Sequence, residues 1–419
     1  MSTKVTGIYD ARKELGWGKS IIMGLQQCFA MFGATILVPV LTNSYGEGIV
    51  GLSASVTLFC AGVATLWFHF ITKGKVPVFL GSSFAFLGMY QAIIPQYGKE
   101  YATGGVVAAG GLYVILAILI KVLGTKRVMK LFPPAVCGPL IILIGINLAG
   151  SAIDNLFTNW MLGIVPILVI IICNTWGKGM IKIIPVLISL IVSYIVAIIM
   201  GAVDFSAVGS ANWVGLPNFH LPKFNADAMV AGLAVAVAAM VEHVGDVMAI
   251  GATCGKNFIA DPGLTRTLLG DGIGTSLAGL LGGPANTTYS ENTGVVALTR
   301  VFDPFVMRIA AVMAIILSLS PKFEAVINSI PAAIIGGISF VLYGMIAATG
   351  IRTIVENQVD YVNMRNVLIT AIILVSGLGF NHKNIVIGSV AFGGLACAAV
   401  FGIILNAILP GKDYEFKED

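Results

Sequence analysis

The sequence predicts an all-α polytopic membrane protein with 14 transmembrane segments, arranged as two inverted repeats of seven segments each. The first supporting observation is composition. Of the 419 residues, 57% are hydrophobic and only 11% are charged, whereas a soluble protein carries about a quarter charged residues. The second observation is the distribution of Lys and Arg between successive loops, and the third is a motif that recurs seven segments later. We therefore expect the lipid bilayer as a partner, and no nucleic acid.

A membrane-spanning helix needs about 20 predominantly apolar residues. Reading the apolar runs in order, we expect segments near residues 18–40, 50–72, 76–96, 103–124, 133–150, 158–176, 181–203, 228–250, 264–282, 284–300, 304–320, 331–350, 365–380 and 386–409.

The basic residues test this series, because cytoplasmic loops of membrane proteins are enriched in Lys and Arg. If the N-terminus is cytoplasmic, the outside loops hold only Lys99, Lys223, Lys322 and Lys383, which leaves 20 of the 24 basic residues inside. An error in the number of segments would reverse this alternation from the error onward. The sequence therefore predicts that both termini lie in the cytoplasm.

The reactive side chains predict neither an enzyme nor a metal site. The six Cys residues are scattered through apolar runs, and the four His residues lack the spacing of metal ligands. Neither HExxH nor GxSxG occurs in the chain. We expect no cofactor.

An internal repeat supports the inverted arrangement. Residues 132–144, FPPAVCGPLIILI, resemble residues 330–342, IPAAIIGGISFVL, and the two stretches open segments five and twelve. Because seven is an odd number, the second copy enters the membrane in the opposite direction, as in many secondary transporters. The identical pairs are Pro133 and Pro331, Ala135 and Ala333, and Gly138 and Gly336.

Segments three and ten are also seven apart, and both contain Pro and Gly before a helical stretch, at residues 76–86 and 282–292. From Ser290 to Thr299 a helix would be only about 15 Å long, roughly half the hydrocarbon thickness. We predict an extended half followed by a half-helix in each segment. Such backbone is tolerated at membrane depth only where protein or a cavity covers it, and its free amides can donate to a ligand.

Glu242 and Glu291 lie in stretches that otherwise read as membrane-buried, and Asp246 follows Glu242 by one helical turn. A carboxylate at bilayer depth is costly and marks a candidate functional site. The alternative is a structural polar contact between helices.

Several motifs resemble the nucleobase–ascorbate transporter family, and its bacterial uracil-permease branch in particular. The most specific is NTTYSENTG at residues 286–294, and the others are FAMFGAT at 29–35, LGSSFAF at 80–86 and EHVG at 242–245. The resemblance implies a bacterial cytoplasmic-membrane location and core domains at residues 1–130 and 226–325. It also implies gate domains at residues 131–225 and 326–419, a homodimer through the gate domains, and short strands that cross in segments three and ten.

The same resemblance implies site residues. Glu242 and Glu291 are expected to bind the base, with the backbone amides of Phe84 and Ser290 as donors. Tyr289 is expected beside the site. Tyr343, on segment twelve, is expected to face it from the gate domain.

The expected function is uracil import by proton symport, with Glu242, Asp246 and Glu291 sharing the proton; sodium is the alternative coupling ion. Asp246 stands where the best-known uracil permeases carry a histidine, and an acid there is seen in the purine branch. A xanthine or urate symporter is therefore the first alternative. An anion transporter of related architecture is disfavoured, because paired acids repel anions.

Overall fold

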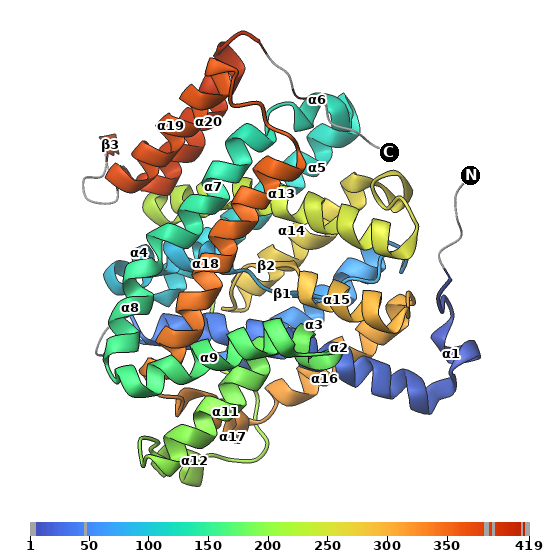
Figure 1. Cartoon of the computed structure of the whole chain (residues 1–419), viewed down its shortest axis with the longest axis vertical. Coiled ribbons are helices and arrows are strands. Elements are labelled where there is room, and N and C mark those ends of the chain that lie inside the picture. The colour runs from blue at the N-terminus through green and yellow to red at the C-terminus, as the bar shows by residue number, and fades with distance from the viewer. Residues whose placement is uncertain (1–5, 46–47, 381–384, 388–389, 412–413, 415–419) are drawn as a thin grey trace.

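We describe the computed structural model of the chain at residues 6–45, 48–380, 385–387, 390–411 and 414. Residues 1–5 of the first expected domain, residues 415–419 of the last one and the loop residue Lys383 lie outside the described residues. Within the described residues the chain is mostly helical (Figure 1).

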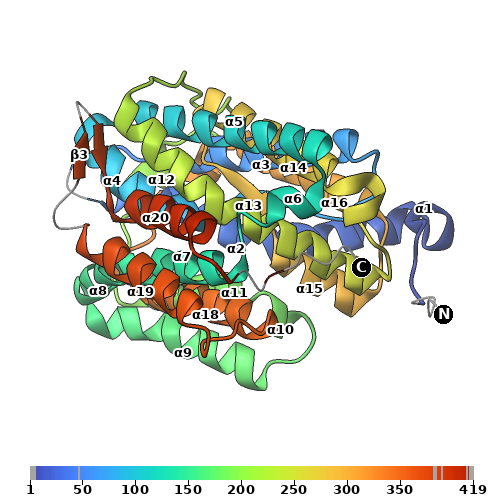
Figure 2. The same cartoon turned by 90° about the horizontal axis from the view of Figure 1, so that it is seen from above.

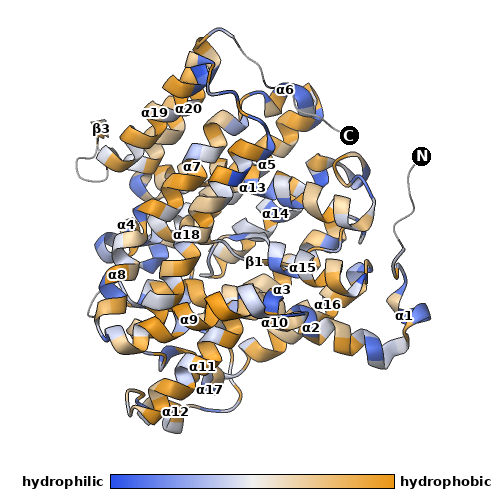
Figure 3. Ribbon diagram, viewed as in Figure 1, coloured by the Kyte–Doolittle hydropathy of each residue, from blue (hydrophilic) through white to orange (hydrophobic). Residues whose placement is uncertain are grey.

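In the described part of the chain, six helical stretches are long and apolar enough to cross a bilayer, and Figure 3 shows that hydrophobic residues cover most of their length. A seventh is a broken pair, α16 and α17, whose axes differ by 84°. The six are α2 (Gly16–Asn43), α3 (Ala54–Ile71), α5 (Lys99–Leu123), α7 with α8 (Pro134–Phe157), α13 (Ala226–Cys254) and α18 (Ala332–Glu356).

Shorter helices occupy the other expected segments, so helix length alone does not decide the number of spans. They are α4 (Leu87–Tyr97), α9 (Trp160–Trp176), α11 (Pro185–Ile199), α14 (Leu264–Leu280), α15 (Ser290–Thr299), α16 (Pro304–Ser318), α19 (Met364–Gly379) and α20 (Gly394–Ile408). Within the long broken stretch, α7 covers Pro134–Asn147 and α8 covers Ala149–Phe157. The connecting turns are α1 (Ala11–Glu14), α6 (Thr125–Met129), α10 (Met180–Ile183), α12 (Ser206–Ser210), α17 (Pro321–Asn328) and the π-helical η2 (Ile259–Gly263).

The interruption of segments three and ten is confirmed. Strand β1 (Leu80–Ser82) pairs antiparallel with strand β2 (Asn286–Thr288), and the two lie near the centre of the molecule in Figure 1. A short 3-10 helix, η1 (Phe84–Phe86), follows β1, and α15 (Ser290–Thr299) follows β2 with the expected bounds. The chain thus changes from extended to helical twice, at opposite ends of one strand pair.

Segment fourteen differs from the expectation of a helical span over 386–409. Its first part forms strand β3 (Ile385–Ile387), antiparallel to strand β4 (Val390–Phe392), and the helix begins only at Gly394. Short apolar runs rich in β-branched residues suit a strand as well as a helix. Helix α17 was also not expected. It begins because Pro321 suits a first helical turn and Ser320 accepts a hydrogen bond from the amide of Phe323.

The helices pack mainly within two groups. In Figure 2, α3, α5 and α14 of one group lie above α8, α9 and α18 of the other. The first helix group comprises α2 to α5 and α13 to α16, and the second comprises α7 to α9, α11 and α18 to α20. Within the second group α7 and α18 touch through glycines. A Cβ added at Gly138 would lie 3.0 Å from the carbonyl oxygen of Gly350, and one added at Gly350 would lie 2.6 Å from that of Gly138. Small residues permit this close approach of helices where lipid supplies no hydrophobic drive.

Candidate functional site

The candidate site is built on the crossing of β1 and β2. The ladder pairs Leu80 with Thr288 and Ser82 with Asn286. It is extended by hydrogen bonds from the Ser83 amide to the Ala285 oxygen (2.8 Å) and from the Tyr289 amide to the Phe79 oxygen (3.0 Å). The pairing is symmetric about its centre, so the two following helices leave in opposite directions.

Both helices start without a side-chain cap. Helix η1 begins at Phe84 and α15 begins at Ser290, and neither preceding residue caps its helix through a side chain. The first amides of a helix have no acceptor within it, and they lie at the positive end of the helix dipole. The crossing therefore brings together two helix starts with free backbone donors, at Phe84 and Ser290.

The three carboxyls that the sequence singles out as candidate site groups lie together beside this crossing. Glu242 and Asp246 lie on α13, which packs against η1, β2 and α15. Glu291 lies in the first turn of α15. The three carboxyls are half-buried and close enough to interact electrostatically. The residues that the sequence singled out one by one thus form a single acidic cluster.

Asp246 has a partner that sequence reasoning missed. The Thr288 hydroxyl donates to Oδ2 of Asp246 at 2.6 Å, which ties α13 to the last residue of β2. A short hydrogen bond to a carboxylate is one of the stronger kinds. Thr288 belongs to the motif at residues 286–294, but its pairing with Asp246 has no signal in the sequence.

Sequence reasoning also missed a fourth carboxyl next to the cluster, that of Asp271. Nδ1 of His243 lies 2.8 Å from Oδ2 of Asp271, and neither side chain is exposed. The electrostatic neighbours of Glu242 and Asp246 include Asp271. Asp271 lies on α14, a predicted span, so the rule that singled out Glu242 would also have found it.

Tyr289 lies beside the crossing, but its side chain is used in the core. It is 3% exposed, and its hydroxyl donates to the Ser82 carbonyl oxygen at 2.8 Å. Its ring covers Gly81, where an added Cβ would lie 2.3 Å from the ring atom Cζ. The geometry favours positioning of β1 over stacking on a ligand. Phe84, in contrast, is half-buried at the start of η1.

The Tyr343 hydroxyl lies among other hydroxyl groups. It is buried on α18, and the groups around its hydroxyl are Ser151, Ser339 and Tyr45. It belongs to the second helix group, whereas Glu242 and Glu291 belong to the first.

Another buried contact holds α15 in place. Nδ2 of Asn292 donates to the carbonyl oxygen of Gln27 at 2.9 Å and to its Oε1 at 2.8 Å. Both side chains are almost fully buried. These hydrogen bonds fix α15 to α2 at the residue that follows Glu291. Gln27 is not among the site residues expected from the sequence.

Comparisons with known proteins find a permease family and related uracil permeases. A family model described as "Permease family" matches residues 18–385. The chain is 40% identical to "Uracil permease" of Bacillus subtilis (strain 168) over 96% of this chain and 95% of that protein. It is 39% identical to "Probable uracil permease" of Haemophilus influenzae over 95% and 96%.

Solved structures share the fold. The transmembrane domain of the cyanobacterial bicarbonate transporter BicA aligns with a TM-score of 0.63 and 16% identity, covering 96% of this chain and all of that one. The murine Slc26a9 anion transporter aligns with a TM-score of 0.68 and 10% identity, covering 93% and 67%. Identities this low show the fold alone. The family match and the apolar helices together show that the chain is a multi-pass membrane protein. It belongs to the nucleobase–ascorbate transporter family, which its motifs resemble.

Proposed function

We propose that the protein imports uracil across the bacterial cytoplasmic membrane by proton symport. The observation that carries the proposal is the meeting of carboxyls and uncapped helix starts. Glu242 and Glu291 lie beside the donors at Phe84 and Ser290, in a chain 40% identical to a uracil permease.

This arrangement matches the edges of a pyrimidine base. Uracil is neutral and planar, with two N–H donors and two C=O acceptors. Carboxylates at Glu242 and Glu291 accept from the N–H groups, the amides at Phe84 and Ser290 donate to the carbonyls, and the Phe84 ring stacks on the base. A site built to satisfy particular polar edges rejects molecules that lack them, because its own buried groups would be left unpaired.

Charge balance favours coupling to a cation. Four carboxyls, those of Glu242, Asp246, Asp271 and Glu291, are neighbours. In the part of the chain that the structure describes, the ion pair of Asp271 with His243 is the only one any of them makes. Unpaired buried charges are costly, and a neutral base supplies no counter-charge. Uptake of one proton by Glu242, Asp246 and Glu291 as a unit lowers the negative charge of the cluster by one.

The energy of one proton suffices for accumulation. One charge that crosses 100 mV supplies about 2.3 kcal/mol, and each 1.4 kcal/mol is tenfold. One proton per base therefore supports about fifty-fold accumulation per 100 mV. Sodium remains the alternative, because carboxylate and carbonyl oxygens also suit that ion.

The proposed architecture has 14 spans in two inverted repeats. Strands β1 and β2 pair antiparallel about a symmetric centre. Helices α7 and α18, which open the two copies of the sequence repeat, run antiparallel: Gly138 meets Gly350, and Gly145 meets Tyr343. We identify the first helix group with the core domain, residues 1–130 and 226–325. The second group corresponds to the gate domain, residues 131–225 and 326–419, and the preference of helices for their own group supports this division.

The distribution of Lys and Arg supports cytoplasmic termini. The homodimer through gate domains rests on the family resemblance.

Equilibrium binding of uracil to the purified protein tests the assigned site. Glu242→Gln and Glu291→Gln should each weaken binding at least tenfold, because a neutral amide oxygen is a weaker acceptor for a uracil N–H than a carboxylate oxygen. Glu356→Gln is the matched control, since Glu356 lies on α18 in an exposed pair with Arg352. Variants at Glu242 and Glu291 that bind like the control would refute the site. Displacement of uracil by xanthine at similar concentration would support the purine alternative instead.

Uptake into proteoliposomes tests the coupling ion. A pH gradient, acidic outside, should drive uracil accumulation in sodium-free buffer. Uptake that follows a sodium gradient and ignores the pH gradient would overturn the proton assignment.

A further inference from the structure

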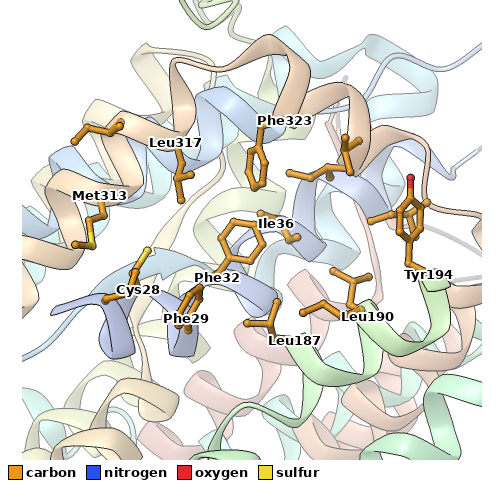
Figure 4. A pocket seen from close by; sticks show the side chains of 16 residues that line it. Cys28, Phe29, Phe32, Ile36, Leu187, Leu190, Tyr194, Met313, Leu317 and Phe323 are labelled. Atoms are coloured by element: carbon orange, nitrogen blue, oxygen red, sulfur yellow. The ribbon is translucent and has the colours of Figure 1, made fainter. Parts of the chain in front are cut away.

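An apolar cavity of about 520 Å³ lies away from the acidic cluster, where three parts of the molecule meet. Its walls come from α2 and α16 of the first helix group, from α11 of the second, and from the connecting helix α17. Figure 4 shows side chains from all these elements pointing into one space, among them Cys28, Leu190, Met313 and Phe323. The cavity therefore lies on the boundary between the two helix groups.

The lining is apolar almost throughout. It consists of aliphatic and aromatic side chains, one Met and one Cys, apart from Tyr194. The Tyr194 hydroxyl is already hydrogen-bonded to the hydroxyl of Ser329 at 2.5 Å. A cavity without free polar partners does not hold ordered water, and it offers no donor or acceptor to a nucleobase. Its volume falls in the range of ligand-sized pockets.

The cavity is continuous with the outer apolar surface of the helices. On its inner side Cys28 and Leu190 are 2% and 9% exposed. On its outer side Ile191 and Ile316 are 51% and 61% exposed. These exposed side chains belong to apolar helices of a membrane protein, so the cavity opens toward lipid hydrocarbon.

One end of the cavity lies close to the membrane–water interface. Phe323 of α17 packs on Phe32, with ring centroids 5.4 Å apart. The neighbouring residue Lys322 places its Nζ 4.6 Å from the ring centre of Trp213. Trp213 is 74% exposed, and Trp and Lys side chains are typical of the interface. The cavity thus lies just below that level, at the depth of phospholipid tails.

We propose that the acyl chain of a membrane phospholipid occupies this cavity, between the two helix groups and under α17. A hydrocarbon chain is the one occupant that matches the lining, the opening toward lipid and the depth. It would supply dispersion contacts that the walls otherwise lack. Since a chain in this position touches α2, α16 and α11 together, it is a bound component of the boundary rather than part of the surrounding lipid.

Photo-crosslinking of the full chain in vesicles tests this proposal. The probe is phosphatidylethanolamine with a diazirine at the middle of one acyl chain, diluted in unlabelled phosphatidylethanolamine. After illumination, peptide mapping by mass spectrometry should show labels on Leu190 and Phe323. These labels should exceed at least fivefold those on Ile118, which lies on the exposed face of α5 and reports surrounding lipid.

Variants that fill the cavity make the test specific. Cys28→Trp and Met313→Trp place a large ring in the cavity from two different helices, and each should reduce labelling of Phe323 at least fivefold while labelling of Ile118 stays unchanged. Ile115→Trp, on the exposed face of α5, adds the same ring outside and should change neither label.

Elution as a single species and thermal melting verify that each variant is folded, without reference to transport. The proposal is overturned if Phe323 is labelled no more than Ile118 in the wild type. It is also overturned if a folded filling variant keeps wild-type labelling of Phe323.

Discussion

Gly81 is the position at which the site geometry is most easily perturbed without touching a charged group. A Cβ at this residue would lie 2.3 Å from Cζ and 2.4 Å from Cε2 of the Tyr289 ring. Ordinary contacts begin at 3.4 Å, so in Gly81→Ala the ring and the strand must separate by about 1 Å. Tyr289 is buried in the core and cannot turn aside.

The expected cost follows from this overlap. Overpacking of a well-packed core costs about 1–3 kcal/mol. The shift also strains the 2.8 Å hydrogen bond from the Tyr289 hydroxyl to the Ser82 oxygen. If the crossing carries the binding geometry, uracil affinity in Gly81→Ala should fall between about fivefold and 150-fold.

The assay is equilibrium uracil binding together with thermal melting. Gly88→Ala is the matched control, because Gly88 lies nearby on α4 with nothing within 4 Å of an added Cβ. It should be neutral or slightly stabilising, since Ala is preferred over Gly in a helix by about 0.5–1 kcal/mol.

A second variant separates the clash from other effects. Tyr289→Leu removes the ring atoms that meet the new Cβ, so Gly81→Ala should cost much less in that background than in the wild type. Equal costs in both backgrounds, or wild-type binding by Gly81→Ala alone, would refute the reasoning.

Three further variants probe the contacts around the cluster. Thr288→Val removes the donor to Asp246 and should lower uracil uptake at least tenfold, because hydrogen bonds to charged groups contribute about 1.5–3 kcal/mol; Thr288→Ser should restore it, and normal uptake by Thr288→Val would contradict the role. Asp271→Ala leaves His243 buried without its partner and should lower the melting temperature by several degrees. Asp271→Asn should lower it less. An unchanged melting temperature in Asp271→Ala would mean that the pair does not stabilise the fold. Arg365→Met should lower the melting temperature and leave uracil affinity unchanged, because the 7% exposed Arg365 side chain donates hydrogen bonds to oxygens at the end of α20. Weaker uracil binding with an unchanged melting temperature would place Arg365 in the binding site instead.

The interrupted segments were predictable because their cause is local. Pro77 and Pro284 cannot donate to a helix, and glycines and small polar residues next to them favour extended backbone. The start of α15 at Ser290 was expected after the extended stretch, although Asn292, Thr293 and Gly294 are weak helix formers. Carboxyls at membrane depth are equally visible in a sequence, which is why Glu242 and Glu291 were found.

Other features depend on contacts that no sequence period records. The bond of Thr288 to Asp246 joins residues 42 positions apart, and the contact of His243 with Asp271 joins two helices. Strands β3 and β4 replaced an expected helical start because an apolar, β-branched run permits both structures. The bend between α16 and α17 needed the packing of α17 over α3 and α2, which the sequence does not show.

The placement of the site has a consequence for how substrate moves. Glu242, Asp246 and Glu291 and both donor helices belong to the first helix group, and Tyr343 is the one proposed contact from the second. If the base is held by one group, it travels with that group, and the second group affects the rate of movement more than the affinity.

Tyr343→Phe separates these two effects. The change deletes only the hydroxyl, whose neighbours are Ser151, Ser339 and Tyr45 rather than the carboxyls. Uracil affinity should stay within about threefold of wild type, which is about 0.7 kcal/mol and lies near the lower end of the about 0.5–1.5 kcal/mol that a neutral hydrogen bond contributes. Uptake into proteoliposomes should change more than affinity does if transport moves the first helix group against the second, because the hydroxyl lies near Tyr45, which follows α2 of the first group. An affinity loss as large as that of Glu242→Gln would mean that Tyr343 closes the site directly, and the base would then be held by both groups at once.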